Sequence, residues 1–173
     1  MDFATRNYIN NLAQQVINVY KFSIPITNID DVVRVIGGKI EEKYNFDDLC
    51  DGTIIKEGDN SFRIAISPFQ SPGRRTFTIA HELGHLFLHM GFRTNLSLWE
   101  AQNKKVFRRF GSSEQEYQAN EFAAALLMPK DKYKEVLFEN CVDGHVDMEI
   151  IASYFNVSQA AAINRGKFLG YLA

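Results

Sequence analysis

The sequence predicts an α+β domain in which one small, mostly antiparallel sheet packs with helices. Three observations support this fold class: helical periodicity near the start, short alternating apolar segments between residues 39 and 67, and longer helical segments after them. The chain has 173 residues, of which 46% are hydrophobic and 23% charged. This length and balance are typical of a globular chain that buries a core without cross-links.

The first part of the chain predicts two helices. Apolar residues recur at helical spacing across residues 5–20. After Pro25, Thr27 or Asn28 can cap a short second helix that runs to Ile36. The two glycines that follow end this second helix.

Three short strands are predicted next, at residues 39–44, 52–56 and 61–67. The last of them alternates apolar and polar residues, and residues 57–60 between the second and third have the composition of a hairpin loop. We expect the strand at 61–67 to offer an exposed edge to which an extended peptide could pair.

Helical periodicity returns after Pro72. One helix is predicted at about residues 74–90 and another at about 114–128, where Pro129 ends it. Residues 130–173 predict two or three more helices. We therefore expect a core at 1–129 and a helical C-terminal region at 130–173, packed on that core.

Composition excludes several classes of protein. The sequence shows neither a secretory signal nor an apolar run near the roughly 18 residues of a membrane span. The net charge of −2 gives no basic field for nucleic acid. Cys50 and Cys141 lie far apart and are expected to be reduced thiols, which favours the cytoplasm.

The segment HELGH at residues 81–85 is the strongest functional signal. On a helix, His81 and His85 lie one turn apart on the same face, so both imidazoles can bind one zinc ion. Glu82 lies about 100° around the helix, where its carboxylate can act as general base on a water molecule. The pattern therefore predicts hydrolysis at a zinc site.

A third ligand is expected from the helix at 114–128. Glu116 shares a helical face with two small alanines, whereas Glu114 and Glu121 project away from that face. Asn120, one turn after Glu116, can accept a hydrogen bond from a zinc-bound histidine. The alternative for Glu116 is a capping box with the serine three residues before it.

Two residues near the motif have other predicted roles. His89 lies eight residues after His81, about 12 Å along the helix, too far to share one tetrahedral centre. We therefore place His89 at the helix end or rim. Gly84 costs about 1 kcal/mol in a helix, which indicates that another backbone passes close to it.

The C-terminal region contains a helix-turn-helix-like element. Asn156 can adopt the left-handed turn conformation and Ser158 can cap the following helix. The second helix offers few groups that could contact DNA, and the net charge is negative. We therefore expect this element to pack or dock a substrate, and we disfavour direct DNA binding.

Residues 75–85 and 116–129 together resemble the ImmA/IrrE family of metallopeptidases. The resemblance implies a minimal zincin-like fold in the core, with zinc on His81, His85 and Glu116 and with Glu82 as general base. It also implies a metallo-endopeptidase that cleaves a partner protein, typically a helix-turn-helix repressor, in transcription regulation or mobile elements.

A second hypothesis is a non-catalytic module of a toxin–antitoxin or repressor pair, with a structural or vestigial zinc. The sequence shows no fourth ligand, and an open position favours the enzyme. Two questions stay open. The segment 91–113, with Trp99 and a basic cluster, fits either a lid or a surface packed on the core. The oxyanion donor is equally open, and the candidates are Tyr117, His145, Tyr154 and Arg165.

Overall fold

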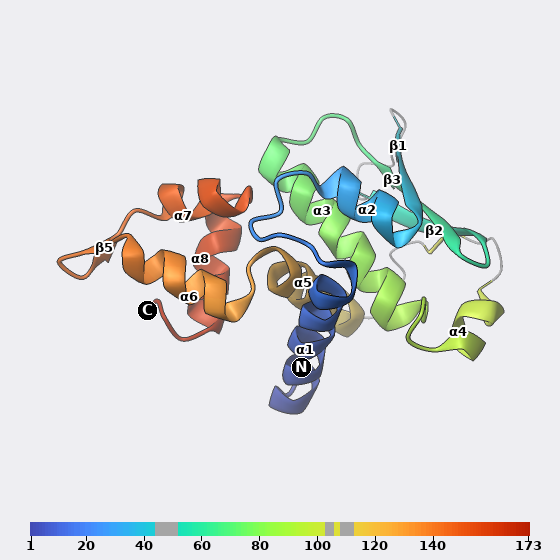
Figure 1. Ribbon diagram of the computed structural model, residues 1–173, viewed down its shortest axis with the longest axis horizontal. Coiled ribbons are helices and arrows are strands. Elements are labelled where there is room, and N and C mark those ends of the chain that lie inside the picture. The colour runs from blue at the N-terminus through green and yellow to red at the C-terminus, as the bar shows by residue number, and fades with distance from the viewer. Residues whose placement is uncertain (44–51, 103–105, 108–112) are drawn as a thin grey trace.

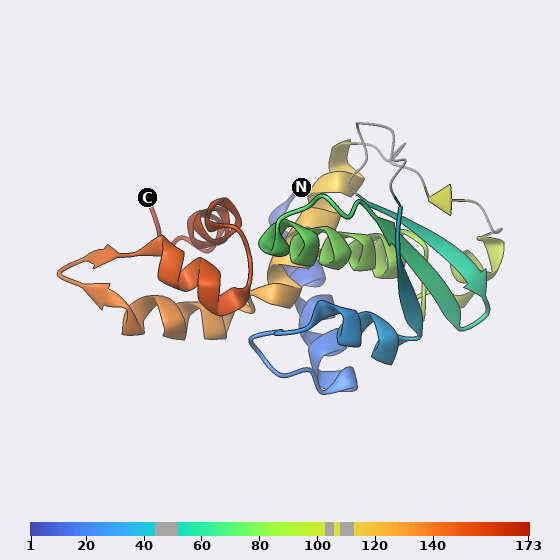
Figure 2. The same cartoon turned by 90° about the horizontal axis from the view of Figure 1, so that it is seen from above.

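The computed structural model describes residues 1–43, 52–102, 106–107 and 113–173. Figures 1 and 2 show the sheet at one end of the molecule and the C-terminal helices at the other, with the long helices α1, α3 and α5 between them. The predicted α+β class is confirmed. Within the described ranges, every helix is too short or too polar to cross a membrane.

The two N-terminal helices match the prediction closely. Helix α1 spans Phe3–Tyr20 and buries one apolar face, and α2 spans Ile29–Ile36. The side chain of Asn28 accepts a hydrogen bond from the backbone N–H of Asp30 and so caps α2. Gly37 ends α2 with a positive φ of 114°, a conformation that favours glycine.

The main sheet has the order β1-β3-β2-β4. Strand β1 (Gly38–Glu42) pairs parallel with β3 (Ser61–Ile66), while β2 (Gly52–Gly58) pairs antiparallel with both β3 and β4 (Val106–Phe107). Because β3 is hydrogen-bonded on both sides, it has no open edge. The expectation that a peptide pairs with residues 61–67 is therefore wrong.

Helix α3 (Pro72–Gly84) packs on β2 and β3 and against α5 (Ser113–Leu127). It continues into a single π-helical turn, η1, at His85–His89. A Cβ atom added to Gly84 would lie 2.9 Å from the Cα of Ala119. The close backbone approach predicted at Gly84 is confirmed.

The segment after η1 forms helix α4 (Leu96–Ala101). Trp99 is buried, and its indole N–H donates to the carbonyl oxygen of Asp59 at 2.6 Å. This contact packs the first half of the segment on the core. The basic cluster at 104–109 lies largely outside the described residues.

The C-terminal region contains α6 (Lys130–Glu139), α7 (Met148–Phe155) and α8 (Gln159–Phe168). A hairpin of β5 (Cys141–Val142) and β6 (His145–Val146), which the sequence did not predict, joins α6 to α7. Asn156 adopts the left-handed conformation, and Ser158 caps α8, as predicted. Cys141 is an exposed free thiol, whereas Cys50 lies outside the described residues.

A buried guanidinium joins the first and last helices to α5. Arg165, only 1% exposed, donates to Glu121 at 3.1 Å, to the Oδ1 of Asn10 at 2.9 Å and to the backbone oxygen of Met128 at 3.0 Å. Burial lowers the pKa of Arg165, and the Glu121 carboxylate opposes this shift. The pairing fixes α8 against α5.

Candidate metal centre

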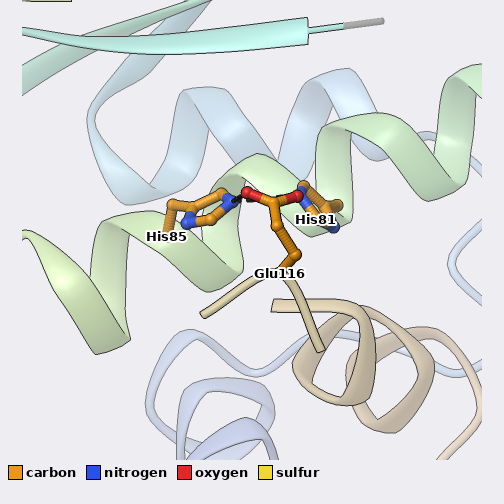
Figure 3. Close-up of side chains that lie close together, drawn as sticks. All are labelled: His81, His85 and Glu116. Atoms are coloured by element: carbon orange, nitrogen blue, oxygen red, sulfur yellow. Dashed lines mark hydrogen bonds and ion pairs between the residues drawn. The ribbon is translucent and has the colours of Figure 1, made fainter. Parts of the chain in front are cut away.

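Three side chains from two helices converge at the centre of the molecule. His81 lies on α3, His85 begins η1, and Glu116 reaches toward both from α5 (Figure 3). The two Nε2 atoms are 3.0 Å apart; that of His81 lies 3.3 Å from Oε2 of Glu116, and that of His85 lies 3.3 Å from the other oxygen, Oε1. The sequence thus correctly predicted which residues meet.

The donor set is compatible with a metal ion such as zinc. Bonds of about 2.0–2.1 Å in a tetrahedron place the donor atoms roughly 3.3 Å from one another. The two Nε2 atoms, 3.0 Å apart, lie near that spacing, and one ligand atom from each of the three residues lies within 4.8 Å of the others. In the described part of the chain, no fourth histidine, cysteine, aspartate or glutamate joins the cluster. The donor set therefore resembles an open, catalytic type of site.

The outer nitrogen of His81 has the partner that the sequence predicted. Its Nδ1 lies 2.9 Å from the Oδ1 of Asn120, one turn after Glu116 on α5. With Nε2 turned toward Glu116, Nδ1 carries the ring hydrogen and donates to the Asn120 amide oxygen. This contact fixes the orientation of the His81 ring.

His85 has an equivalent partner that the sequence analysis missed. The Nδ1 atoms of His85 and His89 are 2.9 Å apart, and the Nε2 of His89 lies 3.0 Å from the Oε1 of Gln118. If Nε2 of His85 faces the cluster, Nδ1–H of His85 donates to Nδ1 of His89, and Nε2–H of His89 donates to Oε1 of Gln118. We call this chain of two hydrogen bonds the relay. Burial lowers the pKa of His89, which favours the neutral ring that this relay requires, although Gln118 opposes the shift.

Glu82 lies in α3 between the two histidines and is 2% exposed. The start of β2 covers it, since a Cβ atom on Gly52 would lie 3.0 Å from the Oε1 of Glu82 and 2.8 Å from the Cγ2 of Thr78. A side chain at position 52 would therefore press on Thr78 and crowd the Glu82 carboxylate, a contact that the sequence analysis did not single out.

The structure also bears on the other acidic residues of α5. Glu121 is committed to Arg165, and Glu114 is largely exposed and 4.0 Å from the N-terminal amine. Both therefore lie away from the cluster, as the helical face predicted. The alternative capping box for Glu116 involves the side chain of Ser113, which lies outside what the structure describes.

A cleft of about 1010 Å³ opens beside the cluster, and His81 and Glu116 are among the residues that line it. Two of the four candidate oxyanion donors, Tyr117 and Arg165, also line it. The guanidinium of Arg165 is buried and already hydrogen-bonded, whereas Tyr117 is 65% exposed. His145 and Tyr154 do not line this cleft.

An α+β domain with two histidines one turn apart on a helix, and a glutamate from a second helix, has the architecture of the zincin class of metallopeptidases. The family model described as the IrrE N-terminal-like domain, a peptidase family, matches residues 39–167, and the chain belongs to this family. The resemblance noted from residues 75–85 and 116–129 is thereby confirmed.

Among solved structures, a transcriptional regulator of Mycobacterium tuberculosis is similar, with a TM-score of 0.58 and 17% sequence identity. The similarity covers 92% of this chain but 46% of that one, so this chain spans less than half of the regulator's length. At this identity the likeness supports the fold alone. No curated protein matches the sequence.

Proposed function

We propose that this protein is a zinc-dependent metallo-endopeptidase that hydrolyses a peptide bond in a specific protein partner. The observation that carries the proposal is the convergence of His81, His85 and Glu116, whose ligand atoms lie within 4.8 Å of one another beside a cleft. Membership of a peptidase family supports it. The three side chains would hold the ion.

Zinc, when bound, would polarise the scissile carbonyl and lower the pKa of a water molecule. In this proposal, the carboxylate of Glu82 takes a proton from the attacking water as the water's oxygen adds to the carbonyl carbon. It then delivers that proton to the amide nitrogen as the carbon–nitrogen bond breaks. Asn120 and His89 orient the two imidazoles.

The proposed partner is a helix-turn-helix repressor, and the proposed compartment is the cytoplasm, where such a repressor acts. The resemblance to the ImmA/IrrE family supports this partner, and the similar solved structure is itself named a transcriptional regulator. We propose that the C-terminal region, residues 130–173, packs on the core and contributes to substrate binding. Arg165 in α8 is buried, so it is not placed to contact DNA phosphates.

Substitution of the general base tests the proposal. Glu82→Gln should keep zinc bound but lower the cleavage rate by about a hundredfold or more, the usual contribution of general base catalysis. The substrate to use is a helix-turn-helix repressor encoded next to this chain, with products read by mass spectrometry. Glu114→Gln, an exposed glutamate on α5, is the matched control.

Cleavage by Glu82→Gln at the wild-type rate would overturn the mechanism. The second candidate is a non-catalytic regulatory module with a structural or vestigial zinc. This candidate predicts that the wild-type protein binds the repressor and zinc but leaves every peptide bond intact.

A further inference from the structure

The cleft beside the metal cluster extends far beyond the three ligands. We propose that it binds three or four residues of the substrate on one side of the scissile bond and selects a large apolar side chain through Phe168. This inference rests on the proposed peptidase function and adds to it a specificity determinant in α8. The occupant is the part of the protein substrate that continues from the cleaved bond.

Helices α3, α5 and α8 each line the cleft with residues from one helical face. Helix α3 contributes Arg74, Phe77 and His81, at the spacing of one helical face. The facing stripe on α5 runs from Glu116 through Asn120 to Ala124, and the outer wall on α8 includes Ala161, Asn164 and Phe168. Because His81 and Glu116 lie in the same cleft, a chain cleaved at the cluster continues directly into it.

The length of the cleft sets the number of residues bound. Glu116 and Ala124 are eight residues apart on α5, a distance of about 12 Å along a helix. An extended peptide advances about 3.3 Å per residue, so this stripe accommodates three or four residues. The volume of about 1010 Å³ lies at the upper end of the range for binding pockets.

The chemistry of the cleft favours an apolar side chain beside Phe168. Phe168 lines the cleft from the end of α8 and is 59% exposed. The guanidinium of Arg6, which also lines the cleft, stands 5.1 Å from its ring centroid. Among the charged lining residues, Glu121 accepts a hydrogen bond from Arg165 at 3.1 Å and forms an ion pair with Arg6 at 3.8 Å, so these charges are paired within the protein.

The α8 wall is held rigidly. The three hydrogen bonds of Arg165 fix it to α1, α5 and the residue before Pro129. The hydroxyl of Tyr133 donates to the backbone oxygen of Ala162 at 2.7 Å and fixes α8 to α6. A rigid wall binds a substrate segment without the entropy cost of ordering a loop.

The experiment uses a library of amine-blocked peptides from a digested bacterial proteome. The full-length zinc-loaded protein is incubated with it, and the cleaved bonds are identified by mass spectrometry. We expect large apolar residues to be enriched within four positions of the cleaved bond, on one side. Phe168→Ala should abolish this enrichment and lower kcat/KM for the preferred peptide roughly tenfold, the usual cost of losing one buried aromatic contact.

Matched controls separate the cleft from general effects on folding. Phe138→Ala removes a phenylalanine of equal exposure, 60%, from α6 outside the cleft, and should leave the enrichment unchanged. Asn164→Trp should block the cleft, whereas Gln159→Trp, on another face of α8, should not. None of the four variants should change zinc affinity.

A binding assay makes failure of this inference distinguishable from failure of the peptidase proposal. The zinc-loaded Glu82→Gln protein is used to capture the same library, and bound peptides are sequenced. Cleavage with the same preference in Phe168→Ala overturns the inference and leaves the peptidase intact. In another outcome, the bound peptides are enriched in apolar residues in a way that depends on Phe168 although the wild type cleaves nothing. That result supports substrate selection by the cleft and overturns the peptidase proposal. The absence of both cleavage and Phe168-dependent enrichment overturns the inference and the peptidase proposal together.

Discussion

The Nδ1 atoms of His85 and His89 lie 2.9 Å apart, so one of the two rings must donate a hydrogen and the other must accept it. Gln118 settles the direction if its amide oxygen accepts from the Nε2 of His89. His85 is then left with an Nε2 lone pair directed toward Glu116. The two rings stand at the first and last residues of the π-helical turn at His85–His89.

Replacing His89 should weaken metal binding. We expect His89→Ala to lower zinc affinity by about 10- to 100-fold, because the acceptor that fixes the His85 ring is lost. Competition with a chromophoric chelator measures this affinity without any substrate. His145→Ala, which removes an exposed histidine from the β5–β6 hairpin, is the control. Equal zinc affinity in the two variants would contradict the relay.

Asn120 should act on His81 in the same way. Asn120→Leu removes the acceptor and should lower zinc affinity by roughly 10-fold or more. Asn120→Asp keeps an acceptor oxygen at nearly the same place and should retain binding. The absorption spectrum of the cobalt-substituted protein reports the ligand geometry directly. A spectrum disturbed equally by both substitutions would show that the amide oxygen has no such role.

Gly84 should tolerate no side chain. An alanine gains about 1 kcal/mol of helix propensity, but its Cβ would lie 2.9 Å from the Cα of Ala119. Because a backbone atom cannot move aside as a flexible side chain can, we expect Gly84→Ala to destabilise the protein by about 1–3 kcal/mol. Urea unfolding measures the change. Ser153→Ala, on the exposed surface of α7, is the control, and a stabilised Gly84→Ala would refute the predicted clash.

The buried pair of Arg165 and Glu121 should behave as a unit. Removing one partner, as in Arg165→Leu, leaves a buried unpaired charge and should cost about 3–5 kcal/mol. The double variant Arg165→Leu, Glu121→Leu should recover part of that loss. A thermodynamic cycle from chemical denaturation measures the coupling. Fully additive effects of the two substitutions would mean that the pair contributes no specific interaction.

Much of this fold could be predicted from local patterns. Apolar spacing gave the helices, and Asn28 and Ser158 marked two helix starts because their side chains cap free backbone N–H groups. The site followed from two rules of helix geometry, the i, i+4 spacing of His81 and His85 and the shared face of Glu116 and Asn120. Both rules use only residues that lie close together in the sequence, so they apply without knowledge of tertiary contacts.

The missed features depend on contacts between distant segments. The central position of β3 follows from its parallel pairing with β1, which alternation within one strand cannot reveal. The relay through His89 was missed because the residue was considered only as a ligand, although its i, i+4 spacing from His85 was a usable signal. The cleft requires α8 to lie beside α3 and α5, which no local pattern in the sequence specifies.

Asn10, Glu121 and Arg165 have a practical consequence for anyone who expresses only the part of this protein that matches the family model. The stretch that matches the family model, residues 39–167, includes Glu121 and Arg165 but omits Asn10 and all of α1. Expressed alone, that stretch would expose the apolar face of α5 and leave the guanidinium of Arg165 with one hydrogen-bond acceptor fewer. The segment that matches the family model is thus shorter than the part of the chain that forms the buried contacts of Arg165.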